Sequence, residues 1–362
     1  MSVVRRPVAV SAFATLLAIT AFSQQAPPTP AAQAPSGQQP AAPTFRGGTT
    51  EVIVPVTVTD DRGKFVSNLV GKDFRILDEG KPQVLQFFSS NQKQPIVVGF
   101  LVDMSNSAKI HWKRYQESIL ELVWNLLPGD KRYSGYLIGY SNDAELLVNT
   151  TSDSDKIADK VRAMKPGGGS ALFDAIYKAC TTRELVKGEP YEPRRIIVII
   201  GDGHDNASKH GIKEVLELAQ RNLVTIYSIS TQAFGFANED RAVLEDLSVK
   251  TGGHVEYPLL NPFKDIAGYL SQPSDAGNYA ITVGTGGYEA QIGKSIFTTV
   301  ANITGEITTQ YVLRYTPEID LEAKPKVFRK ISVDIPSLPN VKINAREGYY
   351  PNGVPGSPTG GN

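Results

Sequence analysis

The most regular feature of the chain is the alternation of apolar strands with helical segments between residues 94 and 260. Strands are expected at 96–102, 135–140, 144–148, 195–200, 224–229 and 254–257, and helices at 113–127, 171–185, 213–221 and 241–249. The strands are almost continuously apolar, which is typical of strands buried on both faces of a sheet. The pattern therefore predicts an α/β region built on a doubly wound, mostly parallel sheet.

The region before it follows a period of two instead. Val52, Val54, Val56 and Val58 alternate with mostly polar neighbours, and the turn-forming residues 60–63 follow. A second hairpin is expected where strands at 74–77 and 84–87 flank the turn residues 78–81.

Short strands separated by turn residues are again expected near the end of the chain. Strands are expected at 311–315, 328–335 and 341–343, with a helix at 292–307 leading into them. Each flank is small for a stable domain, so the economical arrangement is that the two flanks pair with each other. We expect a discontinuous β-sandwich, formed by residues 46–93 and 292–351, into which the α/β region of 94–260 is inserted.

Four further segments complete the predicted organisation. Residues 1–23 carry two arginines, an apolar run and small residues before a cleavage point, which predicts a signal peptide, with an uncleaved anchor as the alternative. Residues 24–45, rich in Pro, Ala and Gln, predict a flexible linker, and residues 352–362 a flexible tail. The insert at 261–291 gives no clear pattern. These features indicate a secreted or periplasmic protein.

Composition narrows the classes of function. Hydrophobic residues make up 41% and charged residues 20% of the 362-residue chain, as in soluble globular proteins. The net charge is zero, so no basic field attracts nucleic acid or an anionic membrane. Cys180 is the single cysteine, which excludes an intramolecular disulfide and a cysteine-based zinc site. Because it lies in an expected helix, we expect a buried, unreactive thiol.

Small oxygen ligands gather where two of the buried strands end. One strand runs into Asp103, Ser105 and Ser107, spaced D-x-S-x-S, and another into Asp202, while Ser170 follows a glycine pair at the start of an expected helix. Ligands bind beyond the carboxyl ends of strands in such sheets, so these oxygens are expected to converge. The set suits a hard divalent cation. The alternative is that the serines cap helices and the aspartates close turns.

Three segments resemble the von Willebrand factor A domain with a metal-ion-dependent adhesion site, which has a Rossmann-like fold. They are Asp103-Met104-Ser105-Asn106-Ser107, Gly-Gly-Ser-Ala-Leu-Phe-Asp-Ala at 168–175 and Ile-Ile-Gly-Asp-Gly-His-Asp-Asn at 199–206. The resemblance covers about residues 95–258. It implies a bound Mg²⁺ or Mn²⁺ ion and a domain that binds other proteins without being catalytic.

The resemblance also implies a role for each ligand. Ser105 and Ser107 would contact the ion directly, and Asp103 and Asp202 would act largely through water. Ser170 stands where the family usually has threonine, so the oxygen is kept but the methyl group that restricts the rotamer is lost.

The flanks extend the resemblance to a narrower group. Asp73-Phe74 with Asp-Glu-Gly-Lys at 78–81, and the segments 310–317 and 345–350, resemble exported bacterial proteins described as von Willebrand factor A-related, which are abundant in Acidobacteria. This resemblance agrees with the predicted signal peptide.

Other ionisable residues near the ligand set suggest catalysis, but each has a simpler explanation. We expect His204 and His210 to be exposed loop residues and Asp205 to make loop hydrogen bonds. Asp174 is expected to support the site or cap a helix instead of binding the ion, and His254 to be structural.

The leading hypothesis is an exported, non-enzymatic module that captures a partner protein, whose Asp or Glu completes the coordination of a divalent ion. One alternative is a metal-free structural scaffold of an envelope assembly. A second, less favoured, is a metal-assisted hydrolase with His204 or Asp205 as the base. No nucleic acid partner is expected, and no membrane contact beyond the export signal.

Overall fold

The computed structural model describes residues 51–90, 95–109, 112–182, 185, 193–232, 238–259, 286–317 and 327–351. The predicted signal peptide, linker and tail, and residues 261–285 of the insert, lie outside this part of the chain. Within the described ranges, each helix is too short or too polar to cross a membrane.

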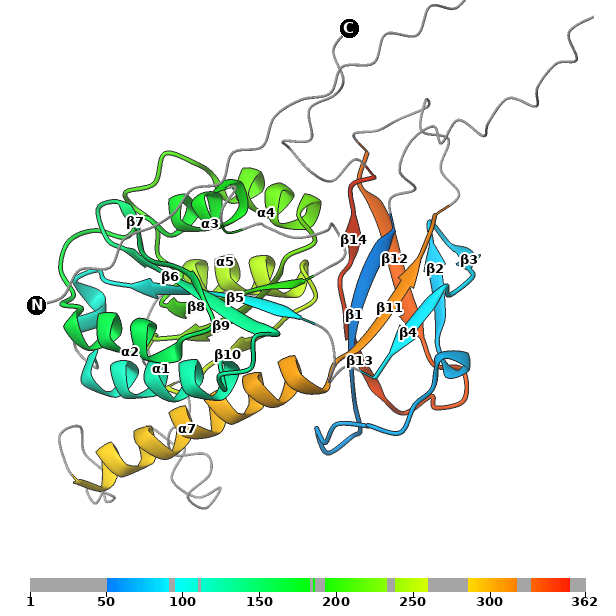
Figure 1. Ribbon diagram of the computed structural model, residues 1–362, viewed down its shortest axis with the longest axis horizontal. Coiled ribbons are helices and arrows are strands. Elements are labelled where there is room, and N and C mark those ends of the chain that lie inside the picture. Colours follow the sequence, from blue (N-terminus) through cyan, green and yellow to red (C-terminus); the bar gives the residue numbers. More distant parts are fainter. Residues whose placement is uncertain are drawn as a thin grey trace, which may run out of the picture. The chain divides into compact units, whose positions relative to one another are not determined.

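Six strands form the central sheet (Figure 1). In spatial order they are β10 (Val255–Glu256), β9 (Thr225–Ser230), β8 (Arg194–Gly201), β5 (Ile96–Asp103), β6 (Tyr133–Tyr140) and β7 (Ala144–Thr151). All neighbours are parallel except β6 and β7, which are antiparallel. The predicted mostly parallel sheet is confirmed.

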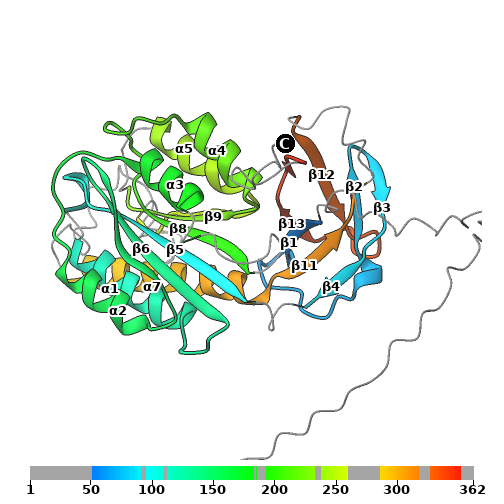
Figure 2. The same cartoon turned by 45° about the horizontal axis from the view of Figure 1, so that its top comes forward.

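Helices cover both faces of this sheet (Figures 1 and 2). One face packs against α1 (Trp112–Leu126), α2 (Ser154–Ala163) and α7 (Gly286–Thr309). The other packs against α3 (Leu172–Thr181), α4 (Ile212–Arg221) and α5 (Asn238–Val249). Two apolar cores result, one on each face, and the doubly wound arrangement is confirmed. Cys180 is buried in the second core, which raises the pKa of its thiol to about 12, so the thiol is unreactive as predicted.

The flanks form two four-stranded sheets. One has the order β13 (Lys342–Ala345), β1 (Val52–Thr59), β11 (Tyr311–Tyr315), β4 (Phe87–Ser89); the other β14 (Gly348–Tyr349), β12 (Arg329–Asp334), β2 (Arg75–Asp78), β3 (Lys81–Gln83). Strand β1 pairs with β11 and β13, and β2 pairs with β12. Each sheet therefore joins strands from both ends of the chain, and the two share one apolar core.

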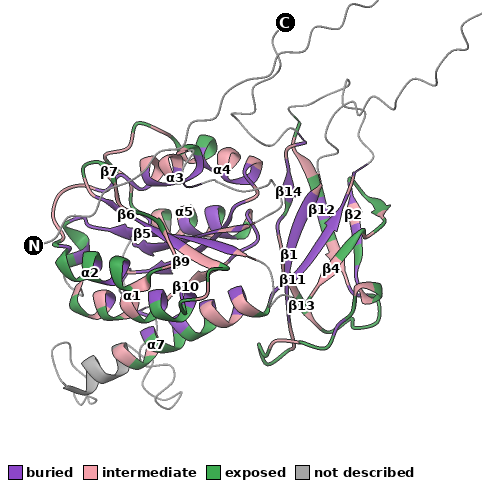
Figure 3. Ribbon diagram, viewed as in Figure 1, coloured by how far each residue is buried: buried purple, intermediate pink, exposed green. Residues whose placement is uncertain are grey.

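One local prediction is corrected by the structure, and two features were not predicted. The partner of β2 in the hairpin is β3, at Lys81–Gln83 and not at 84–87, because Glu79 and Gly80 both adopt a positive φ and close a two-residue turn. Strand β1 is buried on both faces (Figure 3). The face opposite the valines is covered because Ile53 lies near β8 and Thr57 contacts Glu306 of α7. Helix α2 was not predicted from the sequence.

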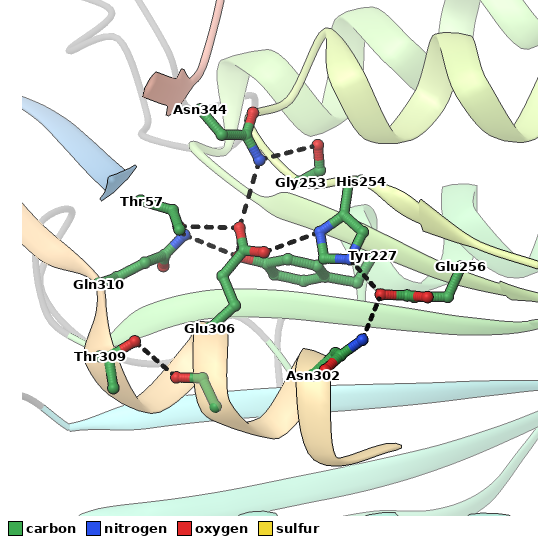
Figure 4. Close-up of polar contacts among 11 residues, drawn as sticks. Thr57, Tyr227, Gly253, His254, Glu256, Asn302, Glu306, Thr309, Gln310 and Asn344 are labelled. Carbon is green, nitrogen blue, oxygen red and sulfur yellow. Dashed lines mark hydrogen bonds and ion pairs between the residues drawn. The ribbon is translucent and has the colours of Figure 1, made fainter. Parts of the chain in front are cut away.

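A buried polar network joins α7 to both regions (Figure 4). Glu306 Oε1 accepts hydrogen bonds from Thr57 Oγ1 of β1 at 2.8 Å and from Asn344 Nδ2 of β13 at 3.2 Å. The same oxygen accepts from the Tyr227 hydroxyl of β9 at 3.3 Å. Glu306 Oε2 lies 2.8 Å from His254 Nδ1, so His254 has the structural role that was predicted.

Candidate metal centre

The site begins where β5 ends. Asp103 is the last residue of that strand, and its Oδ1 accepts a hydrogen bond from the backbone N–H of Ser105 at 2.7 Å. An aspartate that bonds to the backbone two residues ahead stabilises a tight turn, which here reverses the chain at the edge of the sheet. Asp103 is 2% exposed and Ser105 5% exposed, so the inner part of the turn is buried.

A chain of hydroxyl groups connects this turn to the end of β8. The Ser105 and Ser107 Oγ atoms are 2.8 Å apart, and Ser107 Oγ donates to Asp202 Oδ2 at 2.7 Å. Asp202 Oδ1 accepts from the backbone N–H of His204 at 2.9 Å. Ser107 is exposed, so the cluster opens to solvent on its side. The structure thus brings together four of the five predicted ligands, namely Asp103, Ser105, Ser107 and Asp202.

Ser170 lies in the adjoining loop but makes a different contact. Its Oγ donates to the backbone carbonyl of His204 at 2.8 Å, and its backbone N–H donates to Asn206 Oδ1 at 2.9 Å. The hydroxyl does not cap α3, whose N-cap residue is Ala171 and has no side-chain cap. The capping alternative for Ser170 is therefore wrong. Since the hydroxyl donates its proton, the lone pairs of its oxygen are still available to a cation.

Electrostatics at the site favour a positive ion. Burial and then repulsion from the Asp202 carboxylate raise the pKa of Asp103 to about 7, against partial opposition from Ser105 and from the backbone N–H of Asp202. Asp103 Oδ2 is buried and has no hydrogen-bond partner in the described part of the chain. The site therefore holds two neighbouring carboxylates, and the buried Oδ2 of one of them accepts no hydrogen bond. A buried acceptor without a partner is costly in free energy. A cation would supply the missing charge and contact.

The types of donor indicate which cations fit. Among the described residues, no group of three or more His, Cys, Asp and Glu side chains is placed to hold a metal. The oxygens here come from two carboxylates and from serine hydroxyls, a set that suits Mg²⁺ or Mn²⁺ better than ions that prefer nitrogen or sulfur. With few protein ligands, Mg²⁺ would keep several waters. The residues present therefore fit a hard divalent ion.

The neighbouring ionisable residues form a supporting layer. The Asp205 carboxylate accepts from the backbone N–H of Phe173 and from the Ser208 hydroxyl, which confirms its predicted role in loop hydrogen bonds. His204 is exposed as expected, with Nδ1 3.1 Å from Asp240 Oδ1.

His210 differs from the prediction that it is an exposed loop residue. Its Nδ1 lies 2.7 Å from Asp174 Oδ1, and its ring stacks on Tyr177 with a centroid separation of 3.6 Å. Asp174 also accepts from the backbone N–H of Lys209 at 2.9 Å, so it holds the 208–210 loop against α3. Its predicted supporting role fits these contacts.

Three residues that shape the site were missed from the sequence. Asn142 Oδ1 accepts from the backbone N–H of Gly169, and Asn206 Oδ1 from that of Ser170, so two asparagines fix the glycine loop. Tyr140, the last residue of β6, lies directly opposite Asp103 in the strand register. Single asparagines and a strand tyrosine carry no motif that distinguishes them before the register is known.

Comparison with known proteins agrees with this geometry. The von Willebrand factor type A domain family matches residues 98–260. None of the curated proteins compared with the chain matches it.

Several solved structures match part of this chain. The VWA domain of SpRpn10 is 16% identical, with a TM-score of 0.35, over 44% of this chain and 85% of that one. The conserved hypothetical protein BatB of Bacteroides thetaiotaomicron is 15% identical, with a TM-score of 0.36, over 57% of this chain and 98% of that one. Proximal thread matrix protein 1 of the mussel byssus is 14% identical, with a TM-score of 0.37, over 47% of this chain and 43% of that one. That structure has a zinc-occupied MIDAS motif.

The matched family, the parallel sheet with helices on both faces, and the ligand cluster at its carboxyl edge agree with one another. Residues 98–260 of this chain form a von Willebrand factor type A domain.

Proposed function

We propose that this domain captures a partner protein through a bound divalent ion, Mg²⁺ or Mn²⁺, and that the protein is not an enzyme. An Asp or Glu of the partner would complete the coordination of the ion. The observation that carries the proposal is the hydroxyl chain from Ser105 through Ser107 to Asp202, set beside the buried Oδ2 of Asp103.

Each residue has a distinct part in this function. Ser105 and Ser107 present neutral hydroxyl oxygens to the ion, and the two carboxylates balance its charge, largely through water. Ser170 offers a fifth oxygen from the neighbouring loop. When bound, the ion would supply a Lewis-acidic position open to an outside carboxylate. Neutral hydroxyl ligands leave more of the ion's charge uncompensated than carboxylates would, which favours an anionic ligand from a partner.

Two observations disfavour the hydrolase alternative. The Asp205 carboxylate is already engaged by the Phe173 N–H and the Ser208 hydroxyl, so it is poorly placed to accept a proton from water. His204 is held through Nδ1 by Asp240, which raises the pKa of His204 and favours its protonated form. A general base must be able to accept a proton in the reacting geometry.

The N-terminal pattern and the flank motifs support export to the periplasm or the cell exterior, and membership of the exported bacterial group abundant in Acidobacteria. These parts of the proposal rest on the sequence. Expression of the full chain in a bacterial host, followed by cell fractionation and mass analysis of the mature N-terminus, tests them. A cytoplasmic protein that retains residues 1–23 would contradict them.

The central experiment is calorimetric titration of Mn²⁺ into the full chain, compared with Asp103→Asn and Asp202→Asn. Both variants should lose at least tenfold in affinity. Asp334→Asn, which changes a partly exposed carboxylate on β12 far from the site in sequence, is the matched control and should bind like the wild type. Metal-free Asp103→Asn should also unfold at a higher temperature than wild type, because it removes a buried charge that Asp202 repels. Binding that survives in both site variants would contradict the proposal.

The carboxylate step needs its own measurement. Water-proton relaxation of the Mn²⁺-loaded protein reports exchangeable water on the ion. Addition of an Asp-containing peptide should lower that relaxation, because its carboxylate displaces water, and the matched Asn peptide should not. Equal effects of the two peptides would argue against capture of an acidic side chain.

A further inference from the structure

Two buried oxygens beneath the metal site have no hydrogen-bond partner among the residues that the structure describes. One is Oδ2 of Asp103 and the other is the hydroxyl of Tyr140. The two residues are 2% and 1% exposed, so bulk water does not reach either group. A buried hydroxyl or carboxylate oxygen is nearly always hydrogen-bonded, and each exception needs an explanation.

The strand register places these two oxygens together. Tyr140 of β6 is paired with Asp103 of β5, and Gly201 ends β8 on the other side of β5. A Cβ atom added to Gly201 would overlap the Tyr140 hydroxyl and would lie 3.0 Å from Asp103 Cβ and 3.2 Å from Asp103 Oδ2. The tyrosine side chain therefore crosses the end of β5 and places its hydroxyl over Gly201, beside the aspartate. Two hydrogen bonds of about 2.8 Å each, through one water, can span the separation.

The chemistry of the pair is complementary. Asp103 Oδ1 already accepts from the Ser105 N–H, so Oδ2 is the oxygen left to be oriented. A phenol hydroxyl can donate a hydrogen bond, and the carboxylates of Asp103, Asp202 and Asp205 are near enough to add to the effect of burial in raising the pKa of Tyr140. Groups that hydrogen-bond to a metal ligand fix its orientation and tune the affinity of the metal.

We propose that Tyr140 is a positioning residue of the metal site: its hydroxyl donates to Asp103 Oδ2, directly or through one water, and Gly201 is required because only glycine leaves space for that hydroxyl. This inference rests on the proposed function and adds to it the residue that orients the buried carboxylate. It also assigns Gly201 a role in the site, although glycine has no side chain to contribute.

The chain provides a matched control on the same strand. Tyr136 of β6 lies over Gly99 of β5 as Tyr140 lies over Gly201, and both tyrosines are buried in the same core. Tyr136 is two positions earlier on the same face of the strand, with Ile138 between them, and does not lie at the carboxyl edge. Removal of its hydroxyl makes the same chemical change without touching Asp103.

The test is Mn²⁺ affinity, measured by calorimetry on the full chain. Tyr140→Phe should weaken binding about tenfold or more, the range seen when an outer partner of a ligand is removed. Tyr136→Phe should leave affinity unchanged. Gly201→Ala should weaken binding in the wild-type background and cause a smaller further loss in Tyr140→Phe, because the overlapping hydroxyl is then absent and the close contact that remains is the one with Asp103. Circular dichroism of each variant checks that it is folded.

A measurement on the metal-free protein gives a second readout. The tyrosine Fermi doublet in the ultraviolet Raman spectrum, taken as wild type minus Tyr140→Phe, should show a strong hydrogen-bond donor. If the wild type binds Mn²⁺ and Tyr140→Phe binds it equally well, the inference is overturned while the proposed function stands. An equal loss in Tyr136→Phe would also overturn it, since the effect would then come from packing. If the wild type binds no divalent ion, both the function and this inference fail.

Discussion

His254 Nδ1 lies 2.8 Å from Glu306 Oε2, and this pair joins the residue just before β10 to α7, the helix that leads into the flanking sheets (Figure 4). Burial alone would lower the pKa of His254, but hydrogen bonds to Glu256 and Glu306 and the attraction of both carboxylates raise it to about 9. Burial likewise opposes ionisation of Glu306, yet His254, Thr57 and Asn344 lower its pKa overall. Both groups are therefore charged near neutral pH.

The pair gives the protein a predictable pH dependence of stability. The folded pKa of His254 is above its unfolded value of about 6.5, so its contribution is complete below that pH and is lost as the pH rises through about 9. The pKa of Glu306 is lower in the folded protein than in the unfolded chain. Its contribution to stability is therefore present above the unfolded pKa and is lost as the pH falls through the folded pKa. The stabilisation from His254 is at most about 3 kcal/mol, from the size of its shift.

Urea unfolding of wild type and His254→Gln, from pH 6 to pH 10, measures this contribution. The difference in free energy of unfolding should be largest at pH 6 and should shrink by pH 10. A difference that is constant with pH would show that His254 acts only through packing.

A second buried charge holds the flanking sheets together. Asp78 is fully buried, and its Oδ2 accepts from the hydroxyls of Tyr315 at 2.9 Å and Tyr349 at 2.8 Å. Its Oδ1 pairs with Arg329 at 2.7 Å. Asp78→Asn should cost on the order of 3–5 kcal/mol, because it breaks a buried pair and disrupts the acceptor pattern. Asp334→Asn is the control, since its exposed pair with Arg75 should contribute little. Comparable losses of stability in the two variants would contradict the importance of burial.

The glycines give a third prediction, one about backbone packing. A Cβ atom at Gly253 would overlap the backbone carbonyl of Ile226, whereas one at Gly293 of α7 would meet no atom within 4 Å. Gly253→Ala should therefore destabilise the protein by about 2 kcal/mol or more, because the backbone must move. Gly293→Ala should stabilise it by about 0.5–1 kcal/mol, through the higher helix propensity of alanine. Thermal unfolding of both variants checks the opposite signs.

The sheet and the site edge were predictable because both depend on local patterns. Apolar runs that end in Asp103 and Asp202 identify buried strands and their polar ends without knowledge of the neighbours. Helix α2 was missed because its apolar face is short. Only Ile157, Ala158 and Val161 are buried, and its N-cap, Asp153, resembles any turn residue.

What the sequence did not show depends on contacts between distant residues. Tyr140 reaches Asp103 only because β5 and β6 pair in one register, and a shift by one residue would turn it to the other face. His210 was expected to be exposed because the loop around it is polar, but Asp174 and Tyr177 of α3 hold it. The buried face of β1 was missed for the same reason, since Ile53 and Thr57 meet a region far away in the sequence.

The last prediction concerns Ser170, which is 1% exposed and donates to the His204 carbonyl at 2.8 Å. Ser170→Ala should weaken Mn²⁺ binding, because an oxygen is lost from the site, and should lower stability by about 1 kcal/mol through the lost hydrogen bond. Ser170→Thr keeps the oxygen and restricts the rotamer, so binding should be preserved or tightened.

Ser208→Ala is the matched control for these variants. It removes a hydroxyl that donates to Asp205 at 2.6 Å in the same loop but lies outside the proposed ligand set. It should lower stability without changing Mn²⁺ affinity. Calorimetry and thermal unfolding on all three variants separate the two roles of Ser170. If Ser170→Ala behaves like Ser208→Ala, losing stability and keeping full affinity, the hydroxyl serves only to hold the loop after Asp202, and Ser170 is not a ligand.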